Sequence, residues 1–240
     1  MPTNLFLFTP TYARTATQIY AAMRRRAEIT TQLQQLGHLS SNENLELYDD
    51  FNKRLGVLRT LGYIDEENTV QLKGRVASEV NTADELLLTE LVFENVLAGL
   101  SPPELVSILS ALIFQRKNDD EPILTPSLDE ARATVTRIAN ALGAVQTKSG
   151  LDIDGEGPLL NWGLAEVSYE WARGVSFAEL TTICAEEEGT IVRTINRLDE
   201  TLREVSSIAR IIGDPELFRN AQKGAELIKR DIVFAASLYL

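Results

Sequence analysis

The sequence predicts a mainly α-helical protein in which a partial winged helix with a small β-hairpin is followed by a multi-helix bundle. Three observations support this fold class. After residue 82, apolar residues recur almost throughout at the spacing of a helical face. Four of these runs begin with a hydroxyl residue three positions before a glutamate, a pattern typical of helix N-termini. Nearer the N-terminus, a short helical pattern precedes two strand-like segments.

The composition excludes several classes of protein. The chain has 240 residues, 44% of them hydrophobic, and a formal net charge of −12, which is typical of a globular protein and disfavours a free-standing nucleic-acid binder. One cysteine, Cys184, and one histidine, His38, exclude a disulfide framework and a Cys/His zinc site. The patterns GxxxxGK(S/T), GxGxxG, HExxH and GxSxG do not occur, so the sequence shows no catalytic machinery.

The two ends of the chain predict neither export nor insertion into a membrane. The N-terminal segment MPTNLFLFTP has no basic region and too short an apolar run for a signal peptide. The longest apolar run, IVFAASLYL near the C-terminus, is far shorter than a membrane span requires. We therefore expect no membrane partner.

Two segments precede the predicted bundle. Residues 13–36 predict a helix that ends at Gly37, and its run of arginines at 24–26 could contact phosphates, although a solvated helix face is the favoured interpretation. Residues 51–61 predict a short helix closed by Gly62, and the segments YI and TVQL predict two strands around a DEEN turn. A helix followed by a small hairpin is the second half of a winged helix, and nothing upstream supplies the first half.

The bundle is predicted from apolar spacing and from helix start and stop signals. The predicted helices cover residues 82–98, 102–115, 127–143, 158–173, 176–185, 190–212 and 215–238. The predicted capping boxes pair Thr82 with Glu85, Ser101 with Glu104, Ser127 with Glu130, and Ser176 with Glu179.

The helix predicted at 190–212 has two distinct faces. Its apolar stripe comprises Ile191, Ile195, Leu198, Leu202, Val205, Ala209 and Ile212. Its opposite side, which we call the polar face, comprises Arg193, Arg197, Glu200, Glu204 and Ser207. Arg193 and Arg197 repel each other by roughly 0.2–0.5 kcal/mol, and an external anion would relieve this repulsion. Since Asp199 and Arg203 form a favourable pair of the same spacing, a merely solvated face remains an alternative.

Residues 176–200 also match the spacing of a helix-turn-helix motif, whose second helix would read DNA in the major groove. The turn AEEEG would repel phosphates, however, and the second helix continues well beyond the usual length. DNA binding is therefore the weaker interpretation of this segment.

Four separated blocks carry a resemblance to a known family. They are LRTLGYIDEENTVQLKGRVASEVNTADELLLTELVFENVLAGLSPPELVSILSALIF, YEWARGVSFAEL, EEGTIVRTINRLDETLREV and LIKRDIVFAASLYL. In this order they resemble the C-terminal region, or DSHCT domain, of superkiller-type (Ski-two-like), exosome-associated DExH-box RNA helicases. The similarity runs from about Leu45 to Leu240.

The resemblance implies a domain organisation and a site. Residues 1–47 would be a leader and an arch-stalk-like helix, 48–95 the second part of a winged helix, and 96–240 a ratchet bundle roofing an RNA channel. The helix at 190–212 would be the ratchet helix, with Arg193, Arg197 and Glu200 contacting single-stranded RNA. Asn196 stands where the family often has Lys or Arg, which makes this face less basic.

The resemblance also implies partners that the sequence itself does not contain. The chain would be the RNA-channel part of an ATP-dependent 3′-to-5′ RNA helicase acting with the superkiller complex and the exosome in RNA decay. ATP and Mg²⁺ would be bound by RecA-like motor domains, so we expect no cofactor in this chain. The cytoplasmic branch of the family fits better than the nuclear one. The alternative from another class is a non-catalytic scaffold that binds protein partners through its acidic surface.

Overall fold

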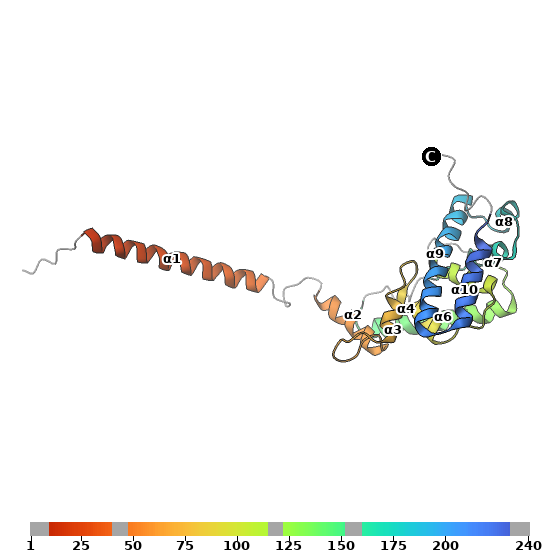
Figure 1. Ribbon diagram of the computed structural model, residues 1–240, viewed down its shortest axis with the longest axis horizontal. Coiled ribbons are helices and arrows are strands. Elements are labelled where there is room, and N and C mark those ends of the chain that lie inside the picture. The colour runs from red at the N-terminus through yellow and green to blue at the C-terminus, as the bar shows by residue number, and fades with distance from the viewer. Residues whose placement is uncertain (1–9, 40–47, 115–121, 152–159, 231–240) are drawn as a thin grey trace, which may run out of the picture. The chain divides into compact units, whose positions relative to one another are not determined.

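The computed structural model describes residues 10–39, 48–114, 122–151 and 160–230 (Figure 1). The helices in these ranges are α1 (Pro10–Leu39), α2 (Tyr48–Thr60), α3 (Leu72–Ala77), α4 (Glu85–Phe93), α5 (Pro102–Ile113), α6 (Pro126–Lys148), α7 (Ala165–Arg173), α8 (Phe177–Ile183), α9 (Glu188–Ile212) and α10 (Pro215–Ile228). No β-strand forms in the described ranges, so the mainly α-helical class is confirmed. The chain divides into two compact units, residues 1–52 and 53–240.

The first unit consists mainly of α1, whose side chains from residue 18 to residue 37 are all exposed. These include its apolar residues Ile19, Tyr20, Met23, Ile29, Leu33 and Leu36. The predicted end at Gly37 is wrong, because the helix continues to Leu39 and Gly37 does not adopt the left-handed conformation of a helix C-cap. The three arginines at 24–26 are exposed, as a solvated face requires.

The predicted small β-hairpin is wrong. Only one isolated antiparallel bridge, between Ile64 and Val70, occurs in this stretch, and α3 begins two residues later. The Asp65 carboxylate closes the turn by accepting hydrogen bonds from the backbone N–H groups of Glu67 and Thr69, at 3.1 and 2.7 Å. The segment that was predicted to form the second strand is thus used to turn the chain into α3.

The bundle is built around α5, which contacts α6, α7, α9 and α10. Every residue from Leu105 to Ile113 is buried, so this part of the helix is covered on all sides, as expected of a central helix. α9 and α10 lie side by side and form a helical hairpin (Figure 1). Gly213 ends α9 with a φ of 78°, and the Asp214 carboxylate then caps α10.

Two of the four predicted capping boxes are confirmed. The glutamates at 104 and 179 each accept hydrogen bonds from the hydroxyl and the N–H of the serine three positions earlier. The predictions at Thr82 and Ser127 are wrong, because Asp84 caps α4 and Thr125 caps α6. In both cases another residue that can cap a helix lies two positions away, so spacing alone did not identify the first residue of the helix.

Several helix boundaries also differ from the prediction. α6 passes through Gly143 and ends at Lys148, while α4 ends at Phe93 rather than at residue 98. α7 begins at Ala165, since the described residues before it, 160–164, are not helical. α10 ends at Ile228 and residues 229–230 are not helical, so the predicted continuation of the last helix is wrong there, while residues 231–238 lie outside the described residues.

Candidate nucleic-acid interface

The two faces predicted for the helix at 190–212 are present in α9. The apolar stripe is buried along its length, except that Ile212 at the end is only partly buried. On the other side, Arg193, Arg197 and Glu200 are exposed, and Glu204 and Ser207 are partly buried. The periodicity of the sequence therefore identified which side of the helix faces outward.

The three predicted RNA-contacting residues do not have equivalent surroundings. Within the described ranges, Arg193 donates only inside its own helix, from Nη2 to Thr190 Oγ1 at 3.1 Å. Glu200 forms no hydrogen bond or ion pair with any residue in the described ranges. Arg197 instead donates from Nε and Nη2 to the Thr82 carbonyl oxygen, at 2.9 and 2.6 Å. The polar face is therefore free at Arg193 and Glu200 but partly engaged at Arg197.

Thr82 is the centre of a group of hydrogen bonds that we call the Thr82 cluster: Thr82, Arg197, Thr201 and Glu204. Glu204 Oε2 accepts from the Asn81 N–H at 3.2 Å, from the Thr82 N–H at 3.3 Å and from the Thr82 hydroxyl at 2.8 Å. The hydroxyl oxygens of Thr82 and Thr201 are 2.8 Å apart. These bonds fix the chain before α4 against one edge of the polar face.

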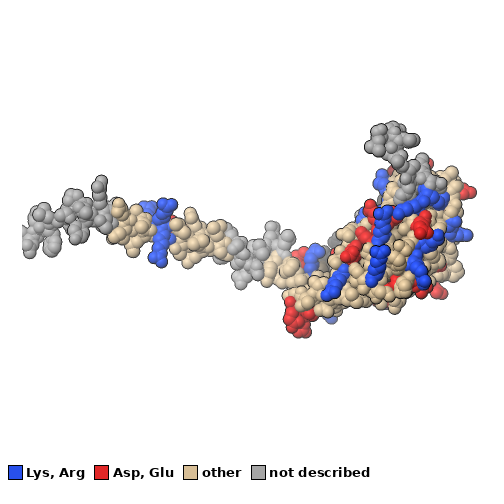
Figure 2. Space-filling view, viewed as in Figure 1, with Lys and Arg blue, Asp and Glu red and all other residues tan. Residues whose placement is uncertain are grey.

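The other edge of the polar face borders α10 and is basic. Asp199, which is buried, lies 2.7 Å from Arg203 Nη2 and 3.0 Å from Lys229 Nζ, the second contact lacking hydrogen-bond geometry. The single negative charge of Asp199 balances only one of the positive charges of Arg203 and Lys229, so this edge keeps a net positive charge. The guanidinium of Arg210 stacks over Phe218, 4.7 Å from the ring centroid. Figure 2 shows Lys and Arg side chains gathered over α9 and α10 on the face in view.

Residues 67–235 match the DSHCT (NUC185) domain family. The chain belongs to this family. The resemblance found in the sequence is therefore confirmed, and the match includes all of α9 and α10 as well as the loop that carries Thr82.

The chain spans only about a fifth of the length of the curated relatives that it matches. It is 43% identical over 225 residues to "Superkiller complex protein 2" of Mus musculus, which covers 92% of this chain and 18% of that protein. It is 45% identical over 213 residues to "DExH-box ATP-dependent RNA helicase DExH11" of Arabidopsis thaliana, covering 88% and 16%. It is 36% identical over 225 residues to "Exosome RNA helicase MTR4" of Mus musculus, covering 92% and 22%.

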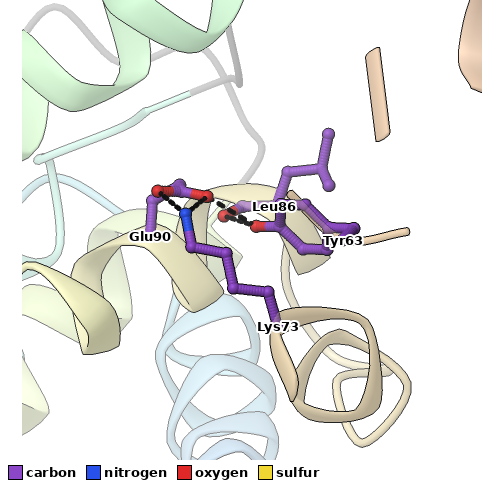
Figure 3. Close-up of polar contacts among 4 residues, drawn as sticks. All are labelled: Tyr63, Lys73, Leu86 and Glu90. Carbon is purple, nitrogen blue, oxygen red and sulfur yellow. Dashed lines mark hydrogen bonds and ion pairs between the residues drawn. The ribbon is translucent and has the colours of Figure 1, made fainter. Parts of the chain in front are cut away.

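A second polar cluster joins the first part of the DSHCT region to α4 (Figure 3). The Glu90 carboxylate accepts from Lys73 Nζ at 2.8 Å on both oxygens and from the Tyr63 hydroxyl at 2.9 Å. Tyr63 OH also lies 3.2 Å from the Leu86 carbonyl oxygen. Burial, followed by the Glu90 charge, raises the pKa of Tyr63 far above its ordinary value, so the phenol stays protonated and donates. Because all these groups satisfy one another, this cluster has a structural role.

A cavity lies beside this cluster, between α2, α3, α4 and the end of α6. Its volume is about 530 Å³, and its walls include Val57, Leu58, Ile64, Val70, Leu86 and Leu151. Asp84 also lines it, and burial raises the pKa of this carboxyl above its ordinary value. The described residues include no group of three or more His, Cys, Asp or Glu that could hold a metal. None of the described helices is long and apolar enough to cross a membrane.

Sequence reasoning missed Thr82 and Thr201 as members of the α9 surface. Thr82 had a local signal, but that signal predicted a helix cap. Its true partners, Arg197, Thr201 and Glu204, are 115 to 122 positions away. Contacts over such separations leave no trace in helical periodicity, so only the structure could assign them.

Proposed function

We propose that this chain is the RNA-channel, or ratchet, portion of an ATP-dependent 3′-to-5′ RNA helicase that acts with the exosome in RNA decay. In this proposal the outward side of α9 contacts single-stranded RNA through Arg193, Arg197 and Glu200. The observation that carries the proposal is that Arg193 and Glu200 are exposed on α9, the longest described helix of a DSHCT bundle, and that neither bonds to a described residue outside α9.

The local charge around α9 supports an anionic partner. The whole chain has a net charge of −12, yet the seam between α9 and α10 has Arg203 and Lys229 beside the buried carboxylate of Asp199, and Arg210 over Phe218. A local basic surface on an acidic protein attracts phosphates where they are needed without making the whole molecule a general nucleic-acid binder. Arginine also stacks on bases, which suits a strand that presents both groups.

The remaining parts of the chain are assigned by the same proposal. Residues 1–47 are an arch-stalk-like helix and leader, 48–95 the second part of a winged helix, and 96–240 the ratchet bundle. RecA-like motor domains bind ATP and Mg²⁺ and supply the movement of the strand. The superkiller complex and the exosome are the protein partners.

Within the family, we place the chain with the superkiller branch and hence in the cytoplasm, with the nucleus as the second choice. The support is the difference in identity, which is 43% for "Superkiller complex protein 2" against 36% for the MTR4 protein. These values are similar enough that both groups share the bundle, so the proposed RNA contact does not depend on the branch.

The proposal is tested by measuring the affinity of the chain for a fluorescent single-stranded RNA over a series of salt concentrations. We expect Arg193→Ala to weaken binding and to lower the slope of log K against log salt by roughly 1 if the side chain contacts a phosphate. If it stacks on a base instead, the loss should be on the order of 1–3 kcal/mol with little change in slope.

The matched control is Arg137→Ala, which removes the same charge from α6, where Arg137 pairs with Glu94. If both substitutions weakened RNA binding equally, the loss would reflect only the removal of one positive charge anywhere on the surface, which would contradict the proposal. Capture of protein partners by a chain that shows no RNA binding at low salt would favour the scaffold instead. A preference for duplex DNA would favour the helix-turn-helix interpretation.

A further inference from the structure

Among the described residues, the side chains of the polar face of α9 form hydrogen bonds outside α9 through Arg197 and Glu204, which both bind the chain at Thr82. Thr82, which is 8% exposed, is held between two residues of α9 that lie two turns apart, Arg197 and Glu204. We propose that Thr82 and Glu204 are positioning residues that hold the Arg197 guanidinium in the orientation in which it meets RNA. This inference rests on the function proposed above.

The hydrogen bonds of the Thr82 cluster connect Glu204 to Arg197 through the backbone of Thr82. Glu204 Oε2 binds the N–H and the hydroxyl of Thr82, and the Thr82 carbonyl oxygen binds Nε and Nη2 of Arg197. Glu204 thus fixes the backbone N–H of Thr82. The backbone C=O of the same residue is thereby held where it accepts the hydrogen bonds from Arg197. Without Glu204, the N–H groups of Asn81 and Thr82 would lose this acceptor, and the carbonyl would no longer be fixed.

The hydroxyl groups of the cluster complete this arrangement. A hydroxyl has one proton and two acceptor positions. Thr201 Oγ1 is 2.9 Å from the Arg197 carbonyl oxygen and 2.8 Å from Thr82 Oγ1. Since the Glu204 carboxylate and the Arg197 carbonyl can only accept, the Thr82 proton goes to Glu204, and the single Thr201 proton is shared between the Arg197 carbonyl oxygen and Thr82 Oγ1. The direction of the bond from the Thr82 hydroxyl to Glu204 is therefore fixed, and this bond restricts how Thr82 can move.

Arg197 remains able to bind RNA while it is held. A guanidinium has five N–H donors, and the Thr82 carbonyl takes only one from Nε and one from Nη2. The remaining edge is free to donate to a phosphate or a base. Because the side chain is already fixed, it loses less rotamer freedom when RNA binds than a free arginine does. The cluster thus increases affinity without contacting RNA.

The test is a double-mutant cycle of Glu204→Ala and Arg197→Ala in the 240-residue chain, with single-stranded RNA as the probe. Electrostatics alone predicts that removing the negative charge of Glu204 strengthens RNA binding. The positioning role predicts the opposite, a roughly two- to tenfold weaker affinity for RNA. This is the loss expected when one side chain that was already fixed must instead be immobilised on binding. In the Arg197→Ala background, Glu204→Ala should no longer weaken binding.

Three further variants separate positioning from general effects. Glu204→Gln keeps an acceptor oxygen and should retain most of the affinity, and Thr82→Val, which removes only the hydroxyl, should give an intermediate loss. Glu79→Ala removes an exposed carboxylate from the segment just before the loop and should not weaken binding. The Nε–H resonance of Arg197, followed by NMR, should show slow exchange in the wild type and in Glu204→Gln, and fast exchange in Glu204→Ala.

The outcomes distinguish this inference from the function on which it rests. If Arg197→Ala weakens RNA binding but Glu204→Ala and Thr82→Val do not, the positioning role is wrong and the RNA contact stands. If Arg197→Ala leaves binding unchanged, the RNA contact of Arg197 and the positioning role both fail. If Glu204→Ala unfolds the chain, the comparison of Glu204→Gln with Thr82→Val decides, since equal wild-type affinity in both would contradict positioning.

Discussion

Single side chains fix α3 and the turn before it to α4. Glu90 on α4 binds Lys73 on α3 and the hydroxyl of Tyr63 in the preceding turn (Figure 3). Lys73 Nζ also lies 5.6 Å from the ring centroids of Tyr63 and Phe93. Buried charges of this kind are tolerated only when each is paired and hydrogen-bonded. The cluster therefore makes α3 and α4 depend on one another.

Tyr63→Phe should lower the free energy of unfolding by roughly 1–2 kcal/mol, because it removes a buried hydrogen bond to a charged group. Urea denaturation followed by circular dichroism measures this loss. The control is Tyr20→Phe, the same chemical change at a side chain that is 76% exposed, which should have no measurable effect. Equal stability of Tyr63→Phe and the wild type would show that the Glu90 cluster contributes nothing to the fold.

The capping carboxylate of Glu104 gives a prediction about pH. Partial burial alone would raise the pKa of Glu104, but the hydrogen bonds from the hydroxyl and N–H of Ser101 outweigh it, and the pKa lies below its ordinary value of 4.5. A carboxyl whose pKa is lowered by folding stabilises the native state above the unfolded pKa, and the stabilisation is lost as pH falls through the folded pKa.

Glu104→Gln should therefore cost roughly 1 kcal/mol or less at neutral pH, where a half-exposed cap is screened by solvent. The cost should shrink as pH falls below 4.5, the ordinary value. Thermal melts of both proteins over this pH range measure the difference. A gap in stability that stays constant with pH would mean that the Glu104 charge is not what caps α5.

At the scale of helices, the sequence predicts those features that depend on neighbouring residues. The buried stripe of α9 and the capping boxes at Ser101 and Ser176 follow from local spacing, and the structure contains them. The β-hairpin failed because the Asp65 side chain, not a second strand, pairs with the backbone of the turn. The exposure of Arg193 and Glu200 follows from local helical spacing and was predictable. The bond of Arg197 to Thr82 joins residues 115 positions apart and was not.

Close packing of α3 on the turn before it yields a prediction at Gly74. A Cβ atom at this position would lie 2.6 Å from the Tyr63 carbonyl oxygen and 2.7 Å from Val70 Cγ1. Gly74→Ala should therefore cost on the order of 1–3 kcal/mol, as overpacking against backbone does. The measurement is the midpoint of urea unfolding.

The matched comparison is Gly56→Ala in α2, where no heavy atom lies within 4 Å of the added Cβ. That substitution should stabilise the chain by up to about 1 kcal/mol, because alanine favours a helix more than glycine does. The two substitutions should thus change the free energy of unfolding in opposite directions. A neutral or stabilising Gly74→Ala would show that α3 does not pack against Tyr63 as described.

At the scale of the whole molecule, the two units differ in how much core they have. The bundle buries a continuous set of apolar side chains around α5, whereas the described side chains of α1 are all exposed. Helices in proteins depend mainly on packing of an apolar face, and local stability follows such packing. The apolar residues of α1 thus contribute little to the stability of this chain.

Amide hydrogen exchange should therefore be fast throughout α1 and slowest in α5 and in the buried half of α9. Mass spectrometry of peptides after timed exchange measures this difference. Protection of α1 equal to that of α5 would show that α1 is packed against an apolar surface in solution, and its exposed Met23, Leu33 and Leu36 would then be contact residues.

The central claim is that the outward side of α9 meets single-stranded RNA, and photo-crosslinking tests it most directly. A thiouridine-containing RNA is irradiated with the chain, and the crosslinked peptides are identified by mass spectrometry. If α9 contacts RNA, we expect crosslinks to concentrate at Arg193, Arg197 and Glu200. They should be reduced in Glu204→Ala and unchanged in Arg137→Ala. Crosslinks confined to other helices, or spread over the surface without enrichment in α9, would contradict it.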